Sequence, residues 1–273
     1  MAQAAMMADL SNKQGYRGTG MTLPLVVEPD QLAAQLNDSN LLILDLTSQE
    51  SYQQGHIPGA IHVDAARLMC GQAPVPNKLP DESQLSTLFS ELGLTPDRQV
   101  VVYDDQNGAL AGRMIWTLHC VNHQQCSFLN GQLNAWKQAG LPLDTTPVYG
   151  KATQYHASIH RELVADIPYI LDQQNNEDCC IWDARSLPEY RGEKVVNAQK
   201  GGHIPGASWY EWTDALVSAD DLRLRAKEEL LAELASRGIT PDKEVITHCQ
   251  THRRSGLTYL VARYLGFKKV RCY

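Results

Sequence analysis

The hexapeptide GHIPGA occurs twice in this chain, at residues 55–60 and 202–207, and this repetition limits the possible folds more than any other feature. Each copy follows an apolar run that ends in aspartate, LLILD at 41–45 and CCIWD at 179–183. An identical string of this length in two similar contexts indicates internal duplication. We therefore predict two versions of one structural unit.

The match continues downstream, where LTPDRQVVVYDD (94–105) aligns with ITPDKEVITHCQ (239–250) at a constant offset. The second unit differs by nine extra residues around RGEKVVNAQKGG and by ending at Tyr273, before a counterpart of the helix predicted in NGQLNAWKQAGLPL. We therefore expect a C-terminal domain that lacks its last helix. The predicted division is a flexible leader over 1–21, an N-terminal domain over 22–143, a linker over 144–160 and a C-terminal domain over 161–273.

Each unit alternates short β-rich runs with helical patterns, which is typical of an α/β domain with a mostly parallel sheet flanked by helices. In ESQLSTLFSELG (82–93), the apolar residues recur at helical spacing and Gly93 supplies a stop signal. SGLTYLVARYLG, near the end of the chain, has the same helical spacing. We predict two tandem α/β domains.

Composition narrows the functional classes. The 273 residues suffice for two domains, and 43% hydrophobic with 20% charged residues is typical of a globular protein. A net charge of −7 argues against nucleic-acid binding, and no apolar run is long enough for a membrane span. The odd number of cysteines, seven, and the absence of a secretory signal predict reduced thiols in a cytoplasmic protein. The scattered histidines predict no metal site.

Cys249 follows an apolar run and precedes a helical pattern, in EVITHCQTHRRSGLTYLVARYLG. This places it on a strand-to-helix loop at the carboxyl end of a strand, where open α/β sheets bind ligands. The following helix begins near Ser255, so its free N–H groups point into the loop and favour an anion. Together with Arg253 and Arg254, they favour thiolate over thiol, and Cys249 is the predicted catalytic nucleophile.

The other loop residues are candidate substrate ligands. Arg253 and Arg254 would bind an anionic substrate, and Arg254 is expected to face inward. His252 is a candidate substrate contact, although a solvent-facing histidine fits the pattern almost as well. Thr251 and Gln250 are expected to contribute backbone N–H groups. A cationic loop with a thiolate suits two reactions, transfer of sulfane sulfur from thiosulfate or transfer of phosphate from a phosphoester, both through a covalent cysteine intermediate.

The repeated unit, its Asp-ended strands and the motifs DARSLPEYRGEK, KGGHIPGA and HCQTHRRSG resemble the tandem-domain rhodaneses of bacteria, over residues 22–273. The resemblance implies a thiosulfate:cyanide sulfurtransferase with a catalytic C-terminal domain and a silent N-terminal one. Asp104 aligns with Cys249, and a carboxylate cannot carry sulfane sulfur. The implied reaction is double displacement through a Cys249 persulfide, without a metal or organic cofactor.

Alternatives remain at this stage. Rhodanese-like phosphatases place five residues between cysteine and arginine, whereas this chain has four between Cys249 and Arg254, which favours sulfur transfer. Mercaptopyruvate-using relatives have a less cationic loop and an arginine where this chain has Glu189, which favours thiosulfate as donor. A mercaptopyruvate sulfurtransferase, a cysteine phosphatase or arsenate reductase, and a persulfide carrier are the alternatives. The expected acceptor is cyanide, a thiol or a protein, and the expected state is a monomer.

Overall fold

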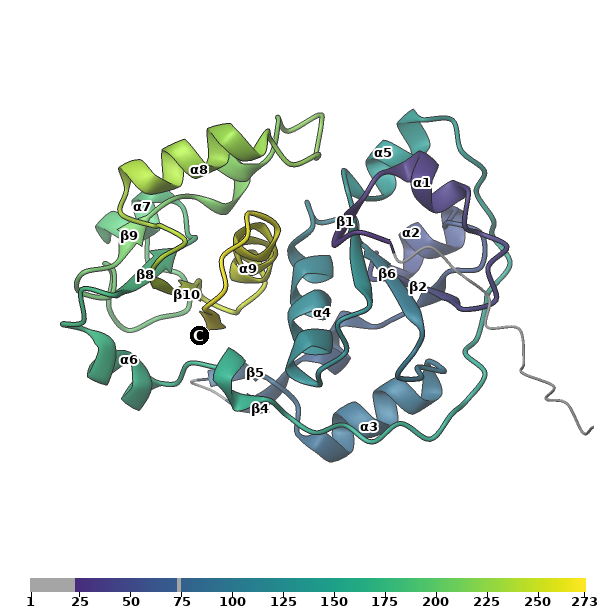
Figure 1. Cartoon of the computed structure of the whole chain (residues 1–273), viewed down its shortest axis with the longest axis horizontal. Coiled ribbons are helices and arrows are strands. Elements are labelled where there is room, and N and C mark those ends of the chain that lie inside the picture. The colour runs from purple at the N-terminus through teal and green to yellow at the C-terminus, as the bar shows by residue number, and fades with distance from the viewer. Residues whose placement is uncertain (1–22, 73–74) are drawn as a thin grey trace, which may run out of the picture.

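The computed structural model describes residues 23–72 and 75–273, and the leader expected over 1–21 lies outside these residues. Two parallel sheets form the frameworks of two α/β units, which lie side by side (Figure 1). The predicted fold class, two tandem units each with a parallel sheet flanked by helices, is confirmed. None of the helices in these residues is both long and apolar enough to cross a membrane.

The first unit has a five-stranded sheet in which all neighbouring strands are parallel. In spatial order the strands are β1 (Val26–Val27), β7 (Cys126–Leu129), β6 (Gln99–Tyr103), β2 (Leu41–Asp45) and β3 (Ile61–His62). Its helices are α1 (Pro29–Ala33), α2 (Gln49–Gln54), α3 (Glu82–Glu91), α4 (Ala109–Cys120) and α5 (Gln132–Gln138). A short antiparallel pair, β4 (Cys70–Gln72) and β5 (Val75–Lys78), and a 3₁₀ helix at Ala65–Leu68 complete it.

The second unit repeats this order with four parallel strands. They are β11 (Val270–Cys272), β10 (Glu244–His248), β8 (Cys179–Asp183) and β9 (Ser208–Trp209). Its helices are α6 (Ile167–Gln173), α7 (Leu187–Arg191), α8 (Lys227–Ser236) and α9 (Arg254–Tyr264), with 3₁₀ helices at Arg161–Leu163 and Trp212–Ala215. β11 ends one residue before Tyr273, the last residue of the given sequence.

The central strands form because their apolar residues are covered on both faces of the sheet. All five residues of β6 are buried, and β2 and β8 each bury their last four. Such continuous apolar runs are typical of parallel strands with helices on both sides. The aspartates that end β2 and β8, Asp45 and Asp183, are fully buried as well.

Both GHIPGA copies make the same contacts. In the first, the ring of His56 stacks on Tyr52 with centroids 3.8 Å apart, and the Tyr52 hydroxyl donates to the carbonyl of Ala60 at 2.9 Å. In the second, His203 stacks on Tyr190 at 3.7 Å, and the Tyr190 hydroxyl donates to Ala207 at 2.7 Å. The motif therefore fixes the turn that leads into β3 and β9.

The two units meet along α4 and α9, which lie next to each other at the centre of the molecule (Figure 1). Every residue of α4 is buried, and one apolar cluster extends from the first unit through this contact into the second. A Cβ atom added to Gly112 would lie 2.5 Å from the carbonyl carbon of Gly256. Glycine at these two positions therefore permits the helix backbones to approach closely.

The segment 144–160 runs from α5 along the first unit to the second (Figure 1). It pairs with the first unit through two isolated bridges, His56 with Asp144 and Ile61 with Val148. Further along, the N–H of His160 donates to the carbonyl of Cys120 at 2.7 Å. The segment is therefore held against the first unit along most of its length.

The close approach of α4 and α9 predicts that Gly112→Ala destabilises the protein, because the added methyl would overlap the Gly256 backbone. We expect the free energy of unfolding to fall by about 1–3 kcal/mol in urea denaturation. Ser83→Ala, on the exposed face of α3, is the control and should leave stability nearly unchanged. An equally stable Gly112→Ala protein would show that the contact does not require glycine.

Candidate active site at the Cys249 loop

Cys249 comes directly after β10 and begins a five-residue loop, residues 249–253, which we call the Cys249 loop; α9 starts at Arg254. β10 is the inner strand between β8 and β11, so the loop begins at the carboxyl edge of the second sheet. Cys249 is only 3% exposed. The thiol therefore lies beneath the loop, where only a small reactant can reach it.

The corresponding loop of the first unit, residues 104–108, binds an anion that belongs to the chain itself. The carboxylate of Asp104 accepts hydrogen bonds from the backbone N–H groups of Gln106, Gly108, Leu110 and Ala111 at 2.8–2.9 Å. Burial raises the pKa of Asp104, and these four donors oppose that shift. A strand-to-helix loop of this architecture can thus surround a negative charge with amide donors.

The Cys249 loop shares part of this backbone geometry. His252 and the aligned Asn107 both have left-handed conformations, with φ of 49° and 57°. Within the described residues, none of the backbone N–H groups of residues 250–253 donates a hydrogen bond. Two of these residues, Thr251 and Arg253, align with Gln106 and Gly108, whose N–H groups bind the Asp104 carboxylate, so their N–H groups are available to an anion bound at the sulfur.

Ser255 connects the sulfur to a histidine. Its hydroxyl donates to Sγ of Cys249 at 3.2 Å, and Nδ1 of His252 lies 2.6 Å from the same hydroxyl oxygen. With the hydroxyl proton directed to sulfur, Nδ1 of His252 is the donor to Ser255. This chain of two hydrogen bonds fixes the position of the thiol.

His252 is buried, which excludes the solvent-facing alternative. Its ring meets the ring of Trp116, from α4 of the first unit, edge-on with centroids 4.4 Å apart. Burial lowers the pKa of His252 well below its usual value, and the cation of Arg113 adds to this, so the imidazole is neutral. The expected contact with substrate stays a prediction.

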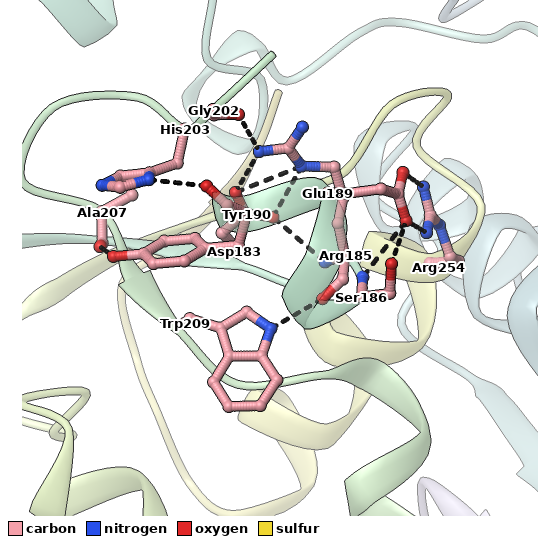
Figure 2. Close-up of polar contacts among 10 residues, drawn as sticks. All are labelled: Asp183, Arg185, Ser186, Glu189, Tyr190, Gly202, His203, Ala207, Trp209 and Arg254. Carbon is pink, nitrogen blue, oxygen red and sulfur yellow. Dashed lines mark hydrogen bonds and ion pairs between the residues drawn. The ribbon is translucent and has the colours of Figure 1, made fainter. Parts of the chain in front are cut away.

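Arg254 lies between the sulfur and a buried carboxylate. It donates two hydrogen bonds to Glu189, at 2.6 and 2.9 Å, and the side chain of Glu189 is only 5% exposed (Figure 2). The bonds from Arg254 lower the pKa of Glu189 to about 2. Burial disfavours the charge of Arg254, but Glu189 and the nearby Cys249 outweigh this and raise the pKa of Arg254. The inward orientation predicted for Arg254 agrees with this placement.

A second ion pair supports the strand end beside the loop. Arg185 binds the fully buried Asp183, with Nη2 at 2.6 Å from Oδ2, and also donates to the carbonyl of Gly202 at 2.8 Å (Figure 2). Because Gly202 precedes the second GHIPGA histidine, this contact connects β8 to the turn before β9.

The remaining predicted loop residues are half-buried. Arg253 is the N-cap of α9, and its buried Nε has no hydrogen-bond partner within the described residues. The side-chain amide of Gln250 donates to the carbonyl of Val196. Gln250 therefore contributes more than a backbone group, because it attaches the extra segment of the second unit to the loop. Thr251 lies between Gln250 and His252 without a side-chain hydrogen bond in the described residues.

Sequence reasoning missed Glu189 and Ser255 as parts of the site. Glu189 stands three residues after Ser186, a spacing that normally indicates only a helix cap, and it does accept hydrogen bonds from Ser186. Its second partner, Arg254, is far away in sequence, and no local pattern reveals such a pair. Ser255 was noted only as the helix start, although its place one residue after Arg254 is the available signal.

Metal chemistry has no visible basis in residues 23–72 and 75–273. No group of three or more His, Cys, Asp or Glu side chains there could hold a metal ion. The chemistry of the loop therefore has to be derived from the thiol, the amide donors and Arg254.

Asp104→Ala should destabilise the first unit, because four buried N–H groups lose their acceptor. We expect the free energy of unfolding to fall by at least about 2 kcal/mol in urea denaturation. The neighbouring Asp105→Ala is the matched control, since Asp105 is exposed and accepts one N–H at 3.2 Å. Equal stability of the two variants would contradict the anion-binding role of this loop.

Glu189→Gln should lower the free energy of unfolding by about 1–3 kcal/mol at pH 7, because it removes the charge that binds Arg254. The folded-state pKa of Glu189 lies below its usual value, so this stabilisation is complete above about pH 4.5 and is lost as the pH falls toward about 2. Urea denaturation between pH 7 and pH 3 should show the difference from wild type shrinking.

The exposed pair of Arg191 with Glu193, at 4.0 Å, provides the control variant Glu193→Gln. Its effect should be small at every pH, since exposed ion pairs contribute little. A difference between wild type and Glu189→Gln that does not change with pH would rule out the ion pair as its cause.

Known proteins with similar sequences and structures match most of this chain. The family model of the rhodanese-like domain matches residues 28–139 and 168–273. Thiosulfate sulfurtransferases from Azotobacter vinelandii and Pseudomonas aeruginosa are 48% and 46% identical, each over 92% of this chain and 92% of the relative.

Among solved structures, the 3-mercaptopyruvate sulfotransferase SseA from Escherichia coli is similar with a TM-score of 0.82 and 28% identity. The match covers 91% of this chain and 97% of that one. The resemblance stated from the repeated motifs is confirmed, and this chain belongs to the rhodanese family, with two rhodanese-like domains in tandem.

Proposed function

We propose that this protein is a thiosulfate sulfurtransferase that carries sulfane sulfur on Cys249. The observation that carries the proposal is the placement of a single cysteine, beside Arg254, on a loop in which the N–H groups of Thr251 and Arg253 donate no hydrogen bond within the described residues, whereas their counterparts Gln106 and Gly108 bind the Asp104 carboxylate. The kinship with curated thiosulfate sulfurtransferases at 46–48% identity supports it.

The proposed reaction has two displacements. In the first, the Cys249 thiolate attacks the outer sulfur of thiosulfate, the S–S bond of thiosulfate breaks, and sulfite leaves with the bonding electron pair. In the second, a nucleophilic acceptor attacks the outer sulfur of the persulfide, and the Cys249 thiolate is regenerated. With cyanide as acceptor the product is thiocyanate; a cellular thiol or a protein can take the same place.

The loop residues have distinct proposed roles. The backbone N–H groups from Gln250 to Arg253 stabilise the negative outer sulfur, as amide donors stabilise an oxyanion. Arg254, oriented by Glu189, favours the sulfur anion, and Arg253 attracts the dianionic donor. Ser255 positions the thiol for attack. Thr251 and His252 complete the loop, His252 through its contact with Ser255.

Thiosulfate is the proposed donor rather than a keto acid. Glu189 stands where the resemblance implies an arginine in mercaptopyruvate-using relatives, so a cation for the carboxylate of 3-mercaptopyruvate is missing at this position. The burial of Cys249 favours a donor that presents a single narrow sulfur atom. The same burial disfavours a tetrahedral phosphoester, which would need a wider opening around the nucleophile.

The proposal includes the domain organisation and the setting. We divide the chain into a catalytically silent N-terminal domain at 22–143, a linker at 144–160 and a catalytic domain at 161–273. All seven cysteines are free, which supports a reducing, cytoplasmic location. A monomer suffices, because both halves of the site belong to one chain.

Intact-protein mass spectrometry after exposure to thiosulfate tests the central step. Wild type should gain the mass of one sulfur atom, which cyanide then removes as thiocyanate. Cys249→Ser should gain nothing, whereas Cys179→Ser, a half-buried cysteine in β8, should behave as wild type. Sulfur on Cys249→Ser would place the persulfide elsewhere and contradict the proposal.

Parallel assays distinguish the alternatives. Faster loading from 3-mercaptopyruvate than from thiosulfate would make this a mercaptopyruvate sulfurtransferase. Cleavage of a phosphoester or reduction of arsenate without sulfur loading would replace the proposal with the corresponding enzyme. A loaded protein that releases sulfur to a protein acceptor and never to cyanide would be a persulfide carrier.

A further inference from the structure

Arg113 is a buried cation that the reaction above does not use. It lies on α4, in the domain without the nucleophile, and is 1% exposed. Among the described residues, no carboxylate lies within ion-pair distance of it. Burial lowers the pKa of Arg113 to about 10, so it is still charged at neutral pH. Burying a guanidinium without an anionic partner lowers the stability of the fold, because the charge loses its hydration. We therefore expect the position of Arg113 to serve a role other than stability.

The guanidinium joins the two domains through backbone carbonyls. On its own domain, Nη2 donates to Leu68 at 2.8 Å and to Asn77 and Lys78 at 3.3 Å each. On the other domain, Nη1 approaches the carbonyl of His252 at 3.4 Å. Three contacts thus hold the guanidinium in place, and the fourth reaches the Cys249 loop.

A second residue of α4 contacts the same histidine. Trp116 meets the His252 ring edge-on at 4.4 Å, and the guanidinium of Arg113 lies 4.7 Å over the Trp116 ring. His252 has φ of 49°, a left-handed conformation that a histidine adopts only at a cost. The aligned residue of the silent loop, Asn107, adopts this conformation more readily. External contacts on both the carbonyl and the ring of His252 can maintain it.

We propose that Arg113 of the N-terminal domain is a positioning residue for the sulfur-transfer site, holding His252 in its left-handed conformation so that the N–H groups of the Cys249 loop converge on the outer sulfur. The inference rests on the proposed sulfur transfer. It assigns the silent domain a direct part in forming the site, through α4.

The alternative is a purely structural role, in which Arg113 only holds the chain near β4 and β5 to α4. The two roles differ in what happens at the Cys249 loop. Loss of a positioning residue loosens residues 249–255 and slows sulfur transfer while the fold persists. If Arg113 has only a structural role, its loss changes the region of Leu68 and Lys78 and leaves the conformation of the Cys249 loop unchanged.

The first measurement is hydrogen–deuterium exchange of the full-length protein, which does not depend on any reaction. In Arg113→Met, the peptide that spans residues 249–258 should exchange at least roughly tenfold faster than in wild type at the hydrogen-bonded N–H groups where α9 begins, such as Gly256, which donates to the carbonyl of Arg253 at 2.9 Å. Arg113→Lys, which keeps the charge but cannot reach both sets of carbonyls, should be intermediate. Arg67→Met is the matched control, since Arg67 is exposed and pairs with Glu91 on the same domain.

The second measurement is the single-turnover rate of sulfite release from thiosulfate. Arg113→Met should lower it by about tenfold to a hundredfold, because small displacements of reacting groups have effects of this size. In the His252→Gly background the same substitution should have a much smaller effect, since glycine adopts the left-handed conformation without external support. The Arg67→Met rate should equal that of wild type.

The outcomes separate the two proposals. Unchanged exchange of residues 249–258 in Arg113→Met would overturn the positioning role. So would effects of Arg113→Met and His252→Gly on the rate that multiply as independent effects do. If Arg113→Met exchanges faster but the wild-type protein never accepts sulfur from thiosulfate, the proposed function is overturned, whereas the positioning contact of Arg113 is retained. If Arg113→Met does not fold, Arg113→Lys carries both tests.

Discussion

The contact between α4 and α9 is the constraint on which the rest of the structure depends. Because Gly112 and Gly256 have no side chains, the two helix backbones meet closely, and one apolar core continues across both domains. The same approach places Trp116 of the first domain against a loop of the second. A larger residue at either glycine would separate the domains and withdraw this support, so domain packing and the architecture of the site are a single requirement.

The two domains have related strand-to-helix loops that differ in the residue at the strand end, Asp104 in the first and Cys249 in the second. In the first, the side chain of Asp104 occupies the amide donors, which stabilises that domain and leaves nothing to react. In the second, Cys249 stands in place of Asp104, and the N–H groups of residues 250–253 donate no hydrogen bond within the part of the chain that the structure describes. The comparison inside one molecule shows that the amide donors of such a loop can bind an anion, and that the two loops differ in the residue at the strand end, Asp104 in one and Cys249 in the other. It also shows how duplication can separate stability from reactivity.

The sequence predicted the elements that depend on local pattern. The repeated GHIPGA, the Asp-ended strands and the apolar runs indicated two parallel α/β units, and the strand-to-helix position of Cys249 followed from them. It could not predict contacts between distant segments. Glu189 looks like a helix cap because its other partner, Arg254, is 65 residues away. The sequence pattern fitted a solvent-facing His252 almost as well as a substrate contact. The side chain that covers His252, Trp116, comes from the other domain, so no local pattern reveals the contact. Arg113 lies in a helical pattern far from the Cys249 motif, so no local signal connects it with the site.

The depth of Cys249 has a consequence for how long a loaded protein survives. A side chain that is 3% exposed is shielded from bulky reductants that diffuse past the surface. Gln250, bound to Val196, adds a segment of chain next to the opening. A sulfur atom delivered to this depth would be kept from random exchange with dissolved thiols and given up only to molecules slender enough to enter. The site would then release its sulfur selectively. The lifetime of the persulfide would depend on which molecules can reach Cys249 rather than on its intrinsic reactivity.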